Sequence, residues 1–127
     1  MLKIDSAQIK VDINLNNGIY HFDCESATGK TRLYYVLKDY QLLGEPVVAY
    51  SYEDYLNGVK LDDKINSNTK LILIDRYDMF KGEYVDLLLK NEKACIVLID
   101  SKETLDFCEY DSVCGINMTK ESIEVFG

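Results

Sequence analysis

The sequence contains no tryptophan, one proline, one histidine and only two arginines. Its four cysteines form no C-x-x-C pair, so we expect free thiols rather than a zinc site or disulfides. No apolar run approaches the ~20 residues that cross a bilayer, and the N-terminus has no apolar stretch typical of a secretion signal. We therefore expect residues 1–127 to form a single soluble, cytoplasmic domain with no membrane contact.

Basic residues are scarce as well. Lysine and arginine together number 14 against 22 acidic residues, which gives a net charge of −8. This balance disfavours direct binding to nucleic acid, because phosphate recognition needs a basic surface. It is compatible with a basic protein partner, and it is also an ordinary means of staying soluble. We expect no nucleic acid ligand, and a protein partner remains open.

The two ends of the chain show the alternation of half-buried strands. Residues 7–15 place apolar side chains at every second position, and the Asn16-Asn17-Gly18 turn predicts a hairpin to a strand at 18–23. Residues 112–118 and 122–126 predict a second hairpin. Both hairpins are typical of antiparallel sheet.

Between the two ends, apolar strands alternate with helices. Residues 32–40 have helical spacing and end near Gly44, and the apolar strands 47–50, 70–75 and 94–100 show no alternation, which indicates burial on both faces. Further helices are predicted within 51–68, at 79–90 and at 104–110. The pattern predicts a three-layer α/β fold, with a mostly parallel core sheet and antiparallel hairpins at both termini.

One segment carries a specific motif. It fits the phosphate-binding pattern G-x-x-x-x-G-K-[ST] at every required position but the first. In such a loop, backbone N–H groups and a lysine hold phosphate oxygens, and a hydroxyl holds Mg²⁺. The predicted strand before it and helix after it match the motif's context, since a helix N-terminus favours anions. The residues predicted to bind the nucleotide are Cys24, Glu25, Ser26, Ala27, Thr28, Gly29, Lys30, Thr31 and Arg32.

A second, weaker motif is an aspartate after an apolar strand. Asp75 follows Leu71–Ile74, and in phosphate-loop proteins such an acid supports the Mg²⁺ held by the loop hydroxyl. Asp100 follows a strand of the same form. By itself the pattern is common, because any buried strand that leads into a loop can end in aspartate.

Together these segments resemble a P-loop NTPase, and in particular the ATP-binding cassette branch. The stretches INLNNGIYHFDCESATGKTRL and KLILIDRYDMF are similar to its Walker A and Walker B regions, and the segment from Cys95 to Gly127 is similar to its closing part. The resemblance implies that Lys30 binds the β- and γ-phosphates of ATP or GTP. It also implies that Thr31 and Asp75 hold the Mg²⁺.

The sequence departs from that family in ways that affect hydrolysis. Cys24 and Ala27 stand where the family usually has glycine, and Arg76 stands where it has a catalytic glutamate. The signature motif and its helical subdomain are absent. Cys24 either fills a glycine position or is a reactive thiol near a helix N-terminus and Lys30.

Three acids are candidates for activating water in place of the missing glutamate. Glu53, Asp78 and Asp100 all follow predicted strands at the edge where α/β sheets bind ligands. The alternative for each is a solvated loop acid with no catalytic role. Arg76 is predicted either to contact phosphate or to pair with a nearby acid.

The sequence leaves more than one function open. The first hypothesis is a small P-loop protein that binds Mg²⁺ with ATP or GTP, hydrolyses it slowly at most, and acts as a switch or accessory protein. The rival is a protein-interaction module on a degenerate P-loop fold, such as an acidic regulator of a nucleic-acid enzyme encoded by a mobile element. A small kinase is disfavoured, because no arginine-rich lid follows the helix. Tyrosines near the predicted site either contact a base or partner, or cover the core.

Overall fold

The computed structural model describes residues 2–4, 9–22, 30–61, 63–75, 95–99 and 113–126. The predicted helices at 79–90 and 104–110 lie outside these residues. The described elements are β1 (Leu2–Ile4), β2 (Lys10–Asn14), β3 (Gly18–Phe22), α1 (Lys30–Leu42), β4 (Val47–Tyr50), α2 (Tyr52–Leu56), β5 (Leu71–Ile74), β6 (Ile96–Ile99), β7 (Val113–Met118) and β8 (Ser122–Phe126).

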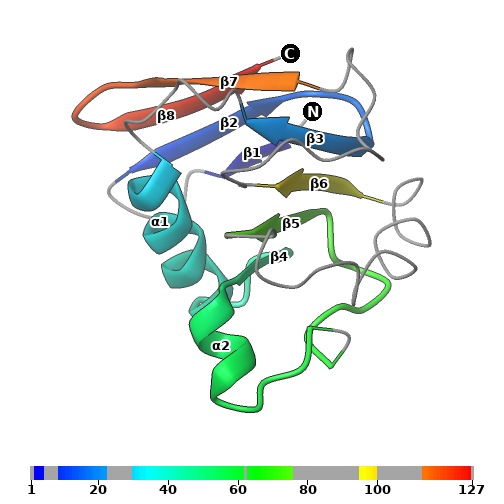
Figure 1. Cartoon of the computed structure of the whole chain (residues 1–127). Coiled ribbons are helices and arrows are strands. Elements are labelled where there is room, and N and C mark those ends of the chain that lie inside the picture. Colours follow the sequence, from blue (N-terminus) through cyan, green and yellow to red (C-terminus); the bar gives the residue numbers. More distant parts are fainter. Residues whose placement is uncertain are drawn as a thin grey trace.

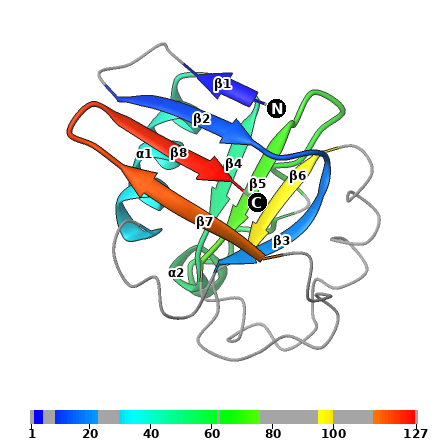
Figure 2. The same ribbon diagram turned by 90° about the horizontal axis from the view of Figure 1, so that it is seen from above.

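The described strands form one mixed, eight-stranded sheet in the order β1-β2-β8-β7-β3-β6-β5-β4. Neighbours from β7 to β4 are parallel, as are β2 and β8, whereas the pairs β1–β2 and β7–β8 are antiparallel. The sheet curls, so that β1, β2, β8 and β7 lie across one end of the parallel half (Figures 1 and 2). The described part is thus α/β in character, but richer in strands than the sequence predicts.

The C-terminal hairpin is confirmed, but the predicted pairing of residues 7–15 with 18–23 is wrong. β2 instead pairs in parallel with β8 and antiparallel with β1, while β3 pairs with β6 and β7. The Gly18 N–H donates to the Cys95 carbonyl, so the chain crosses here from one half of the sheet to the other. The N-terminal antiparallel pair therefore consists of β1 and β2. The Asn17-Gly18 pair favours a local bend in the chain. The strands that pair with β3 are decided instead by the burial of β3 between its two parallel neighbours, β6 and β7.

The central strands are buried on both faces, as their unbroken apolar runs predict. On one face, Leu33, Leu37 and Tyr40 of α1 pack against alternate residues of β4, β5 and β6. On the other face, Leu61 packs with the intervening residues, together with the partly buried Val59. Among the described residues, a helix covers the first face, and the segment around Leu61 covers the second.

Helix α1 also closes the open edge of the sheet. β4 is the last strand in the order, so the outward N–H and C=O of Ala49 have no strand partner. The Ala49 N–H donates to Gln41 Oε1 at 3.0 Å, and Lys38 Nζ donates to the Ala49 carbonyl at 3.2 Å. Two side chains of α1 thus take the place of a neighbouring strand, which protects this edge from pairing with another chain.

The end of α1 has a defined stop signal. Gly44 has φ +86°, its N–H donates to the Gln41 carbonyl, and the Glu45 N–H donates to the Tyr40 carbonyl. These two bonds form a Schellman motif, which satisfies carbonyls at the end of the helix and requires a left-handed residue. This geometry explains the predicted end near Gly44.

Substitution of Gly44 tests this stop signal. A Cβ at Gly44 would meet no atom within 4 Å, so only the positive φ opposes it. We expect Gly44→Ala to lower the free energy of unfolding by about 1 kcal/mol, because alanine is strained in the left-handed region. Urea unfolding measures the change, with Asp39→Ala on the exposed face of α1 as control. An unchanged midpoint in Gly44→Ala would contradict the role given to the motif.

Candidate functional site

Two predicted site residues begin α1. Lys30 and Thr31 are its first two residues, and the helix follows β3 after residues 23–29. The positive end of the dipole of this 13-residue helix lies at its start. The remaining predictions for this loop and two of the predicted bases lie outside the described residues: Cys24, Glu25, Ser26, Ala27, Thr28, Gly29, Asp78 and Asp100.

The Lys30 side chain lies near the junction of β3 and β7. Burial raises the pKa of the Cys114 thiol to about 12, and the Lys30 ammonium opposes this shift. Cys114 pairs with Phe22, the last residue of β3. Lys30 is therefore close to the carboxyl end of β3, and Cys114 is a protonated, buried thiol rather than a nucleophile.

Asp75 directly follows β5 at the same edge of the sheet. Ile74 pairs with Ile99, and Ile99 pairs with His21 of β3, so the residue after Ile74 is level with Phe22. Strands in a sheet are ~4.8 Å apart, which sets β3 and β5 about 10 Å apart with β6 between them. The Asp75 N–H donates to the Tyr50 carbonyl at 2.8 Å, which continues the β4–β5 ladder by one residue.

Arg32, which the sequence assigns to the nucleotide, contacts a backbone turn. Its Nη1 and Nη2 donate to the carbonyls of Thr119 and Lys120, both at 2.9 Å. The guanidinium thereby ties the start of α1 to the turn between β7 and β8. Sequence reasoning could not find this contact, because the partners are 87 and 88 residues away along the chain.

Glu53 and its neighbour Asp54 differ in exposure and in hydrogen bonding. Glu53, a predicted base, is exposed on α2. Asp54 Oδ2 accepts hydrogen bonds from the Tyr34 hydroxyl at 3.2 Å, Lys38 Nζ at 3.1 Å and the Ser51 N–H at 3.0 Å. Ser51 and Asp54 form a capping box at the start of α2. We call Tyr34, Lys38, Ser51 and Asp54 the Asp54 cluster. Sequence reasoning missed it, although Ser51-x-x-Asp54 is a capping-box pattern.

The Asp54 cluster perturbs two pKa values. Burial alone would raise the pKa of Asp54, but the Ser51 N–H and the Lys38 ammonium outweigh burial and hold it below the ordinary 3.8. Burial raises the pKa of Tyr34 to about 12; Ser51 opposes this, while the charges of Asp54 and Asp75 add to it. The negative charge of Asp75 therefore acts on the Tyr34 hydroxyl. Because Tyr34 belongs to the Asp54 cluster, the cluster and Asp75 lie at the same edge of the sheet.

Most tyrosines around this edge have structural contacts. Tyr50 is buried, and its hydroxyl donates to the Val59 carbonyl. Tyr52 and Tyr55 stack on each other with ring centroids 5.8 Å apart. Tyr35, by contrast, is 62% exposed beside Tyr34, which leaves its ring accessible. The covering role suggested for the tyrosines thus holds for Tyr50, while Tyr35 is open to a ligand or partner.

The low pKa of Asp54 predicts a pH dependence of stability. The folded state binds this proton less readily than the unfolded chain, so the stabilisation is complete above the ordinary pKa and is lost as the pH falls through the lowered value. At neutral pH, Asp54→Asn should lower the free energy of unfolding by about 1 kcal/mol, since it weakens the capping box and a partly exposed ion pair.

Urea unfolding across the acid range measures this difference, with Glu53→Gln as the matched control on the same helix. The gap between the protein and Asp54→Asn should close as the pH falls below ~3.8. A gap that persists unchanged at low pH, or an equal effect of Glu53→Gln, would contradict the assignment.

Comparisons with known proteins complete the description of the site. No family model, curated protein or solved structure matches this chain. Within the described residues, no helix is long and apolar enough to cross a membrane, and no group of three histidine, cysteine or acidic side chains is arranged to hold a metal ion. The function is therefore argued from the geometry of α1, β3 and β5.

Proposed function

We propose that this protein binds Mg²⁺ with ATP or GTP at the edge where β3, β6 and β5 end, and that it acts as a nucleotide-dependent switch or accessory protein. In this proposal the fold is a minimal P-loop domain. Lys30 holds the terminal phosphates, Thr31 holds the metal, and Asp75 supports it. The buried residues Cys95 and Cys114 form no disulfide, which is in keeping with a cytoplasmic protein.

The observation that carries the proposal is the common edge of Lys30, Thr31 and Asp75. Parallel strands end on the same side of a sheet, and open α/β sheets bind ligands outside those carboxyl ends. Lys30 and Thr31 are the first residues of the helix that follows β3. Asp75 follows β5 directly. Through the pairing of Ile74 with Ile99 and of Ile99 with His21, it lies one residue beyond His21 along the strand direction. Because β6 lies between β3 and β5, the phosphate and the hydrated metal in this proposal lie beyond the carboxyl ends of the strands rather than between them.

The described acids support slow hydrolysis at most. Asp54 has its carboxylate oxygen engaged by four donors and a lowered pKa, so it is a poor acceptor for a proton from water. Glu53 is exposed on α2, where no described contact orients its carboxylate. Fewer than three metal-binding side chains gather at the described part of this edge, so a bound Mg²⁺ would complete its shell with phosphate oxygens and water.

Loss of the Lys30 ammonium should weaken nucleotide binding. We expect Lys30→Ala to bind Mg²⁺·ATP and Mg²⁺·GTP about 10- to 100-fold more weakly, the effect of one charge-assisted hydrogen bond. Isothermal titration calorimetry measures it, with Lys64→Ala at an exposed lysine as control. Absence of heat for the unsubstituted protein at about 1 mM nucleotide would refute the proposal.

Tyr34 offers an independent reporter of Asp75. Because the Asp75 charge contributes to the raised pKa of Tyr34, Asp75→Asn should lower that pKa. The ring Cζ resonance of Tyr34, assigned by comparison with Tyr34→Phe, follows the titration. An unchanged Tyr34 pKa in Asp75→Asn would contradict the position of Asp75 at this edge.

A second candidate function is a protein-interaction module that does not need nucleotide. It is favoured by the exposure of Tyr35, Leu42 and Leu43 along α1 and of Leu56 on α2, in a chain with net charge −8. Exposed apolar side chains on an acidic chain fit a basic partner with an apolar surface. The calorimetric titration separates the two candidates, because only the first requires that nucleotide bind.

A further inference from the structure

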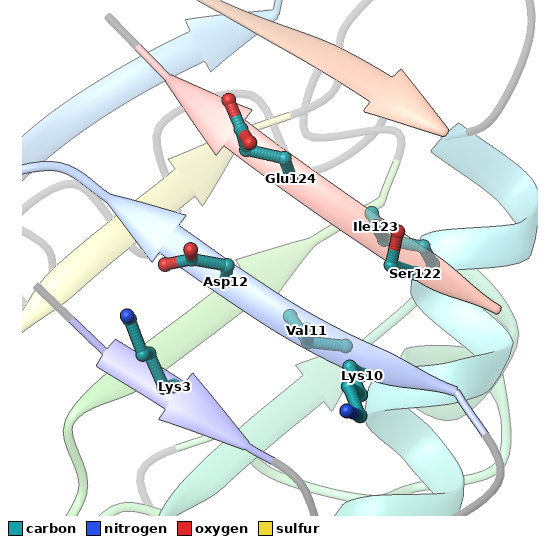
Figure 3. A pocket seen from close by; sticks show the side chains of 7 residues that line it. All are labelled: Lys3, Lys10, Val11, Asp12, Ser122, Ile123 and Glu124. Atoms are coloured by element: carbon teal, nitrogen blue, oxygen red, sulfur yellow. The ribbon is translucent and has the colours of Figure 1, made fainter. Parts of the chain in front are cut away.

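A hollow lies on the strands β1, β2 and β8, and none of its lining residues belongs to the proposed nucleotide site. Its volume is about 310 Å³, within the range of small-molecule sites. Val11 and Ile123 turn their side chains into the core, so the polar residues that alternate with them face the hollow. The lining residues are Lys3, Lys10, Val11, Asp12, Ser122, Ile123 and Glu124 (Figure 3).

Strand register arranges these polar side chains in two rows. Lys3 pairs with Asp12, and Asp12 pairs with Glu124, so a lysine and two acids form one row across three strands (Figure 3). Lys10 pairs with Ser122 in the other row. The rows are two residues apart along the strands, which corresponds to about 7 Å.

Asp12 is the chemically unusual member. Its Oδ1 atom is buried and accepts no hydrogen bond, and it is the only side-chain oxygen or nitrogen in this state among the described residues. A buried acceptor without a partner costs about 1–3 kcal/mol, and more for a charged group. The directly opposed carboxylate of Glu124 adds repulsion. A cation placed between these two acids would relieve the repulsion.

We propose that this hollow binds a small zwitterion about the length of a dipeptide, with its ammonium between Asp12 and Glu124 and its carboxylate against Lys10 and Ser122. The two lysines and two acids of the lining balance in charge, although the whole chain carries −8. A neutral lining with separated charges favours a ligand that is itself neutral and dipolar. Two extended residues span about 7 Å, which matches the spacing of the rows.

Nuclear magnetic resonance titration with glycylglycine tests the proposal on the whole chain. We expect saturable shifts of the amide signals of Lys10, Asp12 and Glu124. Asp12→Asn should weaken the apparent affinity about 10-fold or more, since the neutral amide loses the charge-assisted bond. Asp39→Asn, at an exposed acid on α1, is the control. Lys10→Gln should weaken binding separately, through the carboxylate end of the ligand.

Peptides that lack one of the two charged ends test whether the hollow recognises both the ammonium and the carboxylate. N-acetylglycylglycine lacks the ammonium and glycylglycinamide lacks the carboxylate, so each should bind at least 10-fold more weakly than glycylglycine. Equal shifts with all three probes would overturn the proposal, as would no saturable shift up to about 10 mM glycylglycine. Tight binding of glycylglycinamide alone would also overturn it, because the site would then be a simple cation site. The spectra of each variant report whether it is folded.

Discussion

The packing of α1 against β4, β5 and β6 is the interaction on which the rest of the described structure depends. Leu33, Leu37 and Tyr40 bury one face of the central strands. Burial of large apolar side chains contributes about 1.5–3 kcal/mol each, so this interface outweighs the individual polar contacts around it. It also fixes where α1 begins, and therefore where Lys30 and Thr31 lie relative to the carboxyl end of β3.

The polar contacts of α1 then hold the helix at one position on the sheet. Gln41 and Lys38 satisfy the open edge of β4, Lys38 also pairs with Asp54, and Arg32 binds the turn between β7 and β8. Each contact joins α1 to a different part of the sheet. Apolar packing alone tolerates sliding of a helix, whereas hydrogen bonds to defined backbone atoms do not. The position of Tyr34 beside Asp54 and within reach of Asp75 follows from this anchoring.

The carboxylates of this chain differ in hydrogen bonding and exposure according to their surroundings in the fold. Asp54 has four donors on one oxygen and a lowered pKa, Asp12 has a buried oxygen with no donor, and Glu53 is exposed. In a chain with 22 acids, composition cannot distinguish these three states. The distinction comes from the strand or helix that lies opposite each one, because a donor stabilises a carboxylate only at hydrogen-bond distance.

The sequence by itself determined the local elements. The apolar runs at 47–50, 71–74 and 96–99 became strands buried on both faces, and the helix ends at the glycine that a left-handed residue requires. Periodicity and turn chemistry depend on neighbours a few residues away, so they can be recognised without the fold. Only the tertiary structure decided that β2 pairs with β8 rather than β3, and that Asp54 rather than Glu53 meets Tyr34 and Lys38. Those outcomes depend on which distant surfaces bury each other, which local spacing does not encode.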